Sequence, residues 1–152
     1  MEYFSGGRVE RVIMASFGPG DLFLEGLQQI IDREGIRTGV ITSGIGSFRR
    51  LKFHIISHTG FPPTDRFYDI EGPVELGTMQ GLIVGGQPHL HISFFDVEAG
   101  TAYSGHLEPG SEVCYLLEAC IQVVGGLSLE RVARDPASPG VVCLQTAPRG
   151  GA

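Results

Sequence analysis

Apolar side chains recur along residues 22–33 at steps of three and four, the spacing of one face of an α-helix. Asp21 precedes this run as the predicted N-cap, and Gly35 follows it where a left-handed C-terminal cap belongs. The pattern therefore predicts one main helix, which the chain enters from a strand over residues 8–17 through a turn at residues 18–20.

Short β-branched or alternating segments predict strands through most of the remaining chain. The expected elements are, in order, a strand over 36–42, a turn at 43–46, a strand over 50–57, a loop over 58–69, a strand over 74–84 and a turn at 85–88. Residues 112–124 fit both a helical face and a buried strand, and their periodicity leans toward helix.

A β-hairpin is predicted over residues 89–107, because two alternating runs flank a turn near Gly100. A two-residue loop makes the numbers of paired residues sum to 197, which sets His91 opposite His106 and places His89 on their face. A three-residue loop with a glycine bulge would shift the pairing by one, and the pattern leaves that alternative open.

Three imidazoles on one sheet face are a donor set for a divalent metal such as zinc, which in catalytic sites keeps one position open for water or substrate. The spacing alone also allows a chance His-x-His pair on a polar face. His54 and His58 lie four residues apart in a predicted strand, and we expect both to be ordinary surface histidines.

Three other polar side chains are candidates for supporting roles. Ser93 and Ser104 share the histidine face in the first register, so their hydroxyls are expected to hold ligand rings or substrate. Glu118 lies inside an apolar run, where an unpaired carboxylate is costly, and it is the candidate general acid or base. Solvated serines and a solvated or arginine-paired glutamate are the alternatives.

Composition and charge narrow the class of protein. A chain of 152 residues, 42% hydrophobic and 18% charged, can close the core of one domain. Its net charge of −6 disfavours a broad nucleic-acid footprint. Three cysteines without C-x-x-C spacing, and the lack of a membrane-length apolar run, indicate a cytoplasmic protein without contact to a membrane.

The 23 glycines fall mostly at turns between short elements, which indicates a tightly curved sheet with many turns. Gly105 stands out because it directly precedes His106 within a predicted strand. Its missing side chain is expected to let a ligand or a neighbouring subunit approach the histidine face.

Several spaced motifs together resemble the PPC (plants and prokaryotes conserved) domain family. Along residues 8–134 they are, in order, Gly20-Asp21-Leu22, the segment 40–47 (VITSGIGS), the segment 71–76 (EGPVEL) with Gly81, the segment 88–93 (PHLHIS), Gly105-His106-Leu107 and Glu118. The resemblance implies an α+β fold, with a strongly curved, largely antiparallel β-sheet, one main helix packed on it and assembly as a homotrimer. It also implies that residues 112–124 form a strand, and we adopt that prediction.

The same resemblance implies that His89, His91 and His106 bind a metal, zinc, near a subunit boundary. A more distant similarity to acetolactate decarboxylase adds a small carboxylate or oxo acid as the candidate ligand. DNA binding is the alternative function, because plant members carry AT-hooks beside this domain. This chain has no Arg-Gly-Arg-Pro core, and its negative charge disfavours that alternative.

We expect a single domain over residues 1–134, followed by an extension over residues 135–152. The extension is rich in Pro, Ala, Ser and Gly, so we expect it to be partly flexible. One short apolar run within it predicts a last strand at residues 141–144.

Overall fold

The computed structural model describes residues 1–135 and 141–148, which form one helix and eight strands. The elements are β1 (Arg8–Phe17), α1 (Phe23–Arg33), β2 (Thr38–Ile56), β3 (Asp65–Val84), β4 (Gln87–Asp96), β5 (Thr101–Leu107), β6 (Glu112–Gly125), β7 (Leu129–Ala133) and β8 (Val142–Thr146). Six strands form an antiparallel sheet in the order β1-β6-β2-β3-β4-β5, and β7 and β8 form a separate hairpin. The predicted α+β fold with one helix is confirmed.

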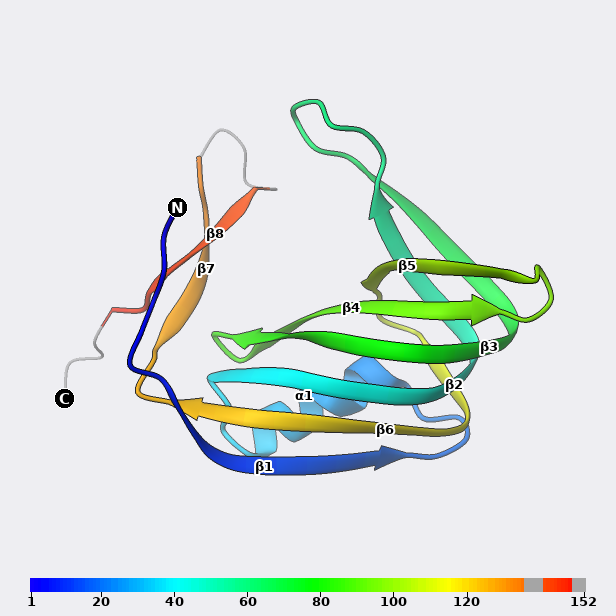
Figure 1. The fold of residues 1–152 in the computed structure, drawn as a ribbon, viewed down its shortest axis with the longest axis horizontal. Helices are drawn as coiled ribbons and strands as arrows, with labels where there is room; N and C mark the ends of the chain where they lie inside the picture. The colour runs from blue at the N-terminus through cyan, green and yellow to red at the C-terminus, as the bar shows by residue number, and fades with distance from the viewer. Residues whose placement is uncertain (136–140, 149–152) are drawn as a thin grey trace.

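The sheet curves back on itself through β2. The end of this strand pairs with β5 as well as with β3, since Phe53 faces Leu107 and His54 faces His106 across the β2–β5 ladder. In Figure 1 the end of β2 and the beginning of β3 turn away from the other strands and extend as an arm. The curvature therefore brings β2 and β5 together although β3 and β4 separate them in the sheet order.

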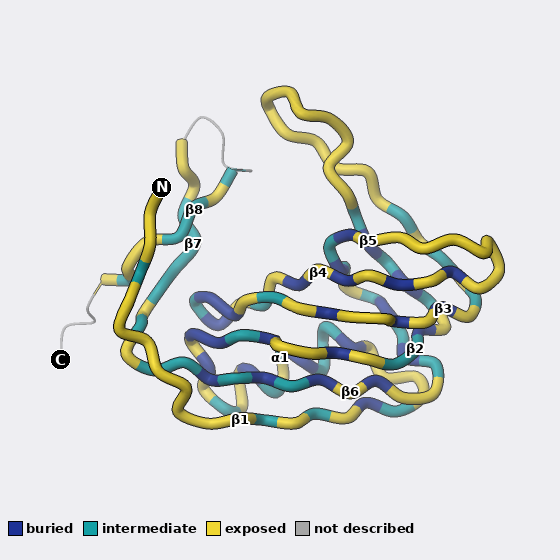
Figure 2. Tube along the Cα trace, viewed as in Figure 1, coloured by how far each residue is buried: buried dark blue, intermediate teal, exposed yellow. Residues whose placement is uncertain are grey.

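The core lies between α1 and one face of the sheet. Phe23, Leu27 and Ile31, at helical spacing, are buried, and the Phe23 ring meets Phe17 edge-on at 4.8 Å between centroids. Buried and exposed residues alternate along β4 and β6, as Figure 2 shows. Figure 1 shows α1 behind the sheet, and we call the opposite face, toward the reader, the open face.

The entry into α1 differs from the prediction. Leu22, and not Asp21, occupies the N-cap, and it makes no side-chain capping bond. The Asp21 carboxylate instead accepts a hydrogen bond from the Gly18 N–H at 2.8 Å, and the Phe23 N–H donates to the Ser111 carbonyl at 3.0 Å. The segment before β6 thus accepts a hydrogen bond from a free N–H group at the start of the helix. At the other end, Gly35 adopts the predicted left-handed conformation, with a φ of 63°.

The predicted turn at residues 43–46 is wrong, because β2 runs through it without a break. The pairing with β6 shifts register here, and Gly46, with φ 146°, comes so close to β6 that a Cβ would lie 2.2 Å from the Leu116 carbonyl oxygen. The glycines therefore mark a bulge in one long strand. The predicted loop over residues 58–69 is also too long, since β3 already begins at Asp65.

The hairpin of β4 and β5 has the register whose paired numbers sum to 197: His91 faces His106 and Ser93 faces Ser104. Its turn is stabilised by Asp96, whose Oδ1 accepts the backbone N–H bonds of the two residues Glu98 and Ala99 at 3.1 and 3.0 Å. The alternative register with a shifted pairing is excluded.

β6 covers the segment whose periodicity leaned toward helix, so that prediction is wrong and the one taken from the family resemblance is right. Every second residue from Leu117 to Ile121 has its side chain buried in the core, as expected of a strand with one buried face: Leu117, Ala119 and Ile121.

β7 and β8 pair as the C-terminal hairpin. β7 lies inside the predicted domain over residues 1–134, and β8 overlaps the predicted strand at residues 141–144. The expected flexibility of the last residues concerns 149–152, which lie outside the described residues. Within the described ranges, no helix combines the length and apolar character needed to cross a bilayer.

Candidate metal centre

Three histidine rings converge on the open face at β4 and β5. The ring centroids of His89 and His91 are 5.4 Å apart, those of His89 and His106 are 4.7 Å apart, and those of His91 and His106 are 5.6 Å apart. One ring nitrogen from each lies within 4.8 Å of the others. Strand alternation and the β4–β5 register produce this arrangement without any irregular backbone.

The environment keeps two of these rings neutral. Burial, followed by the neighbouring His89, lowers the pKa of His106 to about 4. Burial also lowers the pKa of His89, with a smaller contribution from the positive charge of Arg131. Neutral imidazole is the form that binds a metal ion, so the site needs no proton release from these rings near pH 7.

This donor set fits a divalent ion. Three imidazole nitrogens within reach of one another match the ligands of catalytic zinc sites, in which the protein leaves one position for water or substrate. His89 and His91 are exposed to solvent and His106 is half-buried, so an ion and a small molecule both have access.

A second donor group adjoins the first and shares His106. It adds His54 and Glu108, whose donor atoms also lie within 4.8 Å of one another and of His106. The His54 ring stacks on His106, with centroids 4.5 Å apart and 23° between planes, and its Nδ1 lies 2.5 Å from Glu108 Oε1. The prediction of His54 as a surface residue is therefore wrong, while His58 lies in an exposed loop.

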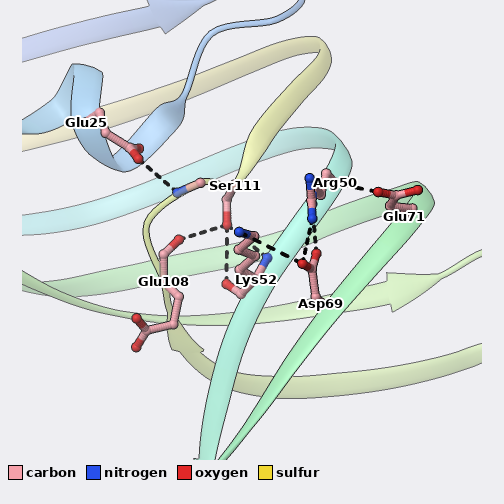
Figure 3. A network of polar contacts seen from close by, with 8 residues as sticks. Glu25, Arg50, Lys52, Asp69, Glu71, Glu108 and Ser111 are labelled. Atoms are coloured by element: carbon pink, nitrogen blue, oxygen red, sulfur yellow. Dashed lines mark hydrogen bonds and ion pairs between the residues drawn. The ribbon is translucent and has the colours of Figure 1, made fainter.

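Glu108 projects from a backbone that is fixed on both sides, as Figure 3 shows in part. Its N–H donates to the Lys52 carbonyl at 2.9 Å, and its own carbonyl accepts the Ser111 hydroxyl at 2.9 Å. Gly110, two residues after Glu108, donates its N–H to the Glu25 carboxylate of α1 at 2.9 Å. The helix therefore supports the turn that carries Glu108.

The predicted serines lie beside the histidines without contacting them. Ser93 and Ser104 face each other across the β4–β5 ladder, and both are exposed. Within the part of the chain that the structure describes, neither hydroxyl makes a hydrogen bond to a histidine, so their supporting role stays a prediction.

Glu118 lies on the open face of β6, exposed and opposite Ile45 of β2. β2 and β3 separate β6 from β4, which is three strand spacings or about 14 Å along the sheet. Within one chain, the predicted acid or base is therefore not brought to the histidines.

Gly105 has a different role from the one expected. Its missing side chain makes room for the backbone of β2, since a Cβ would lie 2.7 Å from the His54 carbonyl oxygen. The residue is buried, and the close approach it allows is that of a neighbouring strand.

A cavity of about 720 Å³ lies beside the histidines, between the open face and the C-terminal hairpin. His89 and His91 line one side, and Arg131 of β7 lines another. The Arg131 guanidinium donates to the Gln87 and Leu82 carbonyl oxygens at 3.1 and 3.3 Å, and burial lowers its pKa. In the described chain, no carboxylate pairs with this arginine.

Most of the remaining cavity wall is apolar, with contributions from both the sheet and the hairpin: Val40, Ile41, Leu82, Val142 and Leu144. Sequence reasoning missed Arg131, because nothing local to residue 131 indicates that the hairpin stands beside β4.

The sequence of residues 4–125 matches the family model described as the Plants and Prokaryotes Conserved (PCC) domain. The chain belongs to this family. The match ends before β7, so the PCC domain supplies the histidines, while Arg131 comes from outside the matched region. A comparison of the sequence with curated proteins finds no match.

Solved structures share the PCC fold. A plant- and prokaryote-conserved protein from Pyrococcus horikoshii is 23% identical, with a TM-score of 0.77, 97% of this chain covered and 100% of that one. A metal-containing protein from Archaeoglobus fulgidus is 20% identical (TM-score 0.75, 91% and 96% covered). A protein from Bacteroides thetaiotaomicron, named as a candidate DNA-binding protein, is 17% identical (TM-score 0.76, 91% and 94% covered).

This chain is also similar, more weakly, to the structure of acetolactate decarboxylase from Bacillus subtilis. That structure is 16% identical with a TM-score of 0.50, and the alignment covers 72% of this chain and 51% of the enzyme. At this identity the likeness concerns the fold alone.

Proposed function

We propose that this protein is a cytoplasmic metal-dependent PCC protein that holds one divalent ion, zinc, through His89, His91 and His106, and acts there on a small carboxylate or oxo acid. The convergence of three imidazoles beside a cavity carries this proposal. The similarity to the metal-containing protein from Archaeoglobus fulgidus supports it. A bound zinc ion would supply a Lewis acid that polarises a carbonyl group or activates water.

The cavity supports an anionic ligand of small size. Arg131 holds its guanidinium in place with two backbone carbonyls and lacks a carboxylate partner in the described chain. A ligand carboxylate would complete the charge pairing, because charge-assisted bonds to arginine are strong where water is partly excluded. The apolar wall would bind the body of the ligand and displace water from it.

We propose further that the protein is a homotrimer assembled through the open face. This face exposes large apolar side chains that a folded monomer would leave in water: Val12, Met14, Ile45, Phe95 and Leu116. Glu118 lies exposed on this same face, so such an assembly would bring it against a neighbouring copy.

Metal analysis tests the central proposal. Untagged protein purified without a nickel column should contain at least about one zinc ion per chain, and His91→Ala should contain about one ion fewer than wild type, since an ion held by two histidines binds far more weakly. His58→Ala, which changes an exposed loop histidine, is the matched control. A folded wild-type protein that holds no stoichiometric metal after incubation with zinc would refute the proposal.

Native mass spectrometry tests the assembly. Met14 is 74% exposed on the open face, so Met14→Glu should convert trimers to smaller species without unfolding the chain. Val97→Glu at the tip of the β4–β5 hairpin, 52% exposed, is the control. A monomeric wild-type protein at micromolar concentration would contradict the trimer.

DNA binding is the second candidate, and the similarity to the candidate DNA-binding protein from Bacteroides thetaiotaomicron favours it. The charge of −6 opposes it, and basic Arg50 of β2 is already paired with Asp69 at 2.7 Å. Titration of a labelled duplex at about 0.1 M salt decides the question, because real binding must weaken steeply with added salt. We expect no binding at micromolar protein.

A further inference from the structure

We propose that His54, His106 and Glu108 form a second divalent-cation site next to the three-histidine centre. This site does not depend on the proposed function, because two of its three donors take no part in the first centre. Its donors come from β2, from β5 and from the turn before β6, so the curvature of the sheet assembles it.

His106 lies between two histidine partners. It faces His91 across the β4–β5 ladder and His54 across the β2–β5 ladder, so three imidazoles form a row over neighbouring strands. Glu108 Oε1 closes the group, at 2.5 Å from His54 Nδ1 and 4.0 Å from His106 Nε2. These distances bring two nitrogens and one carboxylate oxygen into the range that a single ion can bridge.

The site is more sheltered than the first. The side chains of His54, His106 and Glu108 are only 20%, 24% and 25% exposed, whereas His89 and His91 are exposed to solvent. Glu108 also stands on a backbone held by Lys52 and by the fully buried Ser111 (Figure 3). The backbone that carries Glu108 is therefore held in place without an ion, and a small separation of the His54 and Glu108 donor atoms would admit one.

The charge of Glu108 points to a cation. In the described residues neither lysine nor arginine forms an ion pair with it, and its partners are the two histidines. A bound divalent cation would place positive charge directly beside this partly sheltered carboxylate. Asp65, whose Oδ2 lies 4.0 Å from His54 Nε2, offers a further oxygen at the edge of the group.

The donor chemistry selects the class of ion. Two imidazoles and one carboxylate suit zinc and other divalent first-row metals, whereas calcium and magnesium prefer oxygen alone. Binding of an ion at His54 Nδ1 would move the proton that this nitrogen shares with Glu108 Oε1, either to Nε2 of the same ring or to solvent.

The decisive variant removes the first centre and leaves the second intact. His89→Ala combined with His91→Ala deletes two exposed side chains, so the fold should persist. Chelator-treated protein of this double variant is titrated with Co²⁺, and the visible absorption of the bound ion is recorded. We expect one equivalent per chain, and an affinity at least about tenfold lower when Glu108→Gln is added. His58→Ala in the same background is the matched control.

Circular dichroism and thermal unfolding check that each variant is folded, and His54→Gln replaces Glu108→Gln if the latter is not. A folded double variant that takes up no Co²⁺, or whose uptake is unchanged by both Glu108→Gln and His54→Gln, overturns the second site. Neither result touches the proposed function, because the double variant lacks the first centre altogether.

Discussion

Gly105 lies directly against the backbone carbonyl of His54, so that a Cβ at residue 105 would come within 2.7 Å of that oxygen. The same Cβ would also lie 2.7 Å from Cδ2 of Phe53, a buried core ring. Because one of the two obstacles is main chain, a side chain at residue 105 could be accommodated only if β5 moved away from β2. The pairing that stacks His54 on His106 therefore depends on this glycine.

Gly105→Ala should lower the free energy of unfolding by about 1–3 kcal/mol, the usual range for overpacking in a close-packed region. Urea titration measures the change. Gly77→Ala is the control, because a Cβ there would meet only the Ser93 carbonyl oxygen, at an ordinary 3.5 Å. Equal losses in the two variants would show that the β2–β5 contact carries no special constraint.

Acid should destabilise the metal-free protein. Burial lowers the pKa of His106 from 6.5 to about 4, so between these values the unfolded chain binds a proton that the folded chain does not. Stability is therefore lost as the pH falls through this window, by on the order of 2 kcal/mol for a partly sheltered ring, and His106 adds no further loss below pH 4.

The measurement compares urea titrations near pH 7 and pH 4.5 after chelator treatment. His106→Gln should flatten this part of the pH dependence, whereas His58→Ala should not. A wild-type profile with the same slope as that of His106→Gln would contradict the assignment.

Arg131→Gln should weaken the binding of a small carboxylate to the zinc-loaded protein by at least about tenfold, because a charge-assisted bond is lost. Calorimetry with 2-oxobutanoate and with its uncharged methyl ester distinguishes affinity that depends on the carboxylate charge from affinity that depends on the shape of the ligand. The ester should bind wild type and variant alike, and the zinc content should not change. If the variant loses affinity for the ester to the same extent, the arginine supports the cavity wall and does not bind the anion.

Ser111→Ala should cost about 1–3 kcal/mol of stability, since it leaves the Lys52 N–H, which donates to the Ser111 hydroxyl at 3.0 Å, without its partner in the core. Thermal unfolding detects this loss. Ser104→Ala, an exposed serine on β5, should change the midpoint little.

Local sequence pattern was sufficient for features that short-range geometry decides. The β4–β5 register follows from a tight turn and the two-residue period of a strand, so a two-residue loop predicted the pairing of His91 with His106, although the sequence also allowed a pairing shifted by one. Helix α1 followed equally from its apolar spacing, apart from its first residue. The course of β2 was misjudged at Gly46, because a glycine that fits a bulge looks in sequence like one that makes a turn.

Contacts between distant segments were beyond such patterns. His54 and Glu108 are 54 residues apart, and only the curvature of the sheet brings them together. Arg131 reaches the cavity through a hairpin whose partner strand begins at Val142, so no periodicity near residue 131 reveals its surroundings. For β6, the helical spacing of apolar residues was a coincidence that pairing with β1 and β2 on either side overrode.

The cavity has two walls of different origin: the histidine wall belongs to the PCC domain, and the Arg131 wall lies beyond residue 125. Such a division would place the proposed metal ligands inside the family domain and the proposed anion-binding residue outside it. Grafting the segment after residue 125 from another PCC protein onto this chain should exchange the preferred small molecule while the retained ion stays the same. A change confined to this hairpin would then alter the proposed ligand site without altering the proposed metal ligands.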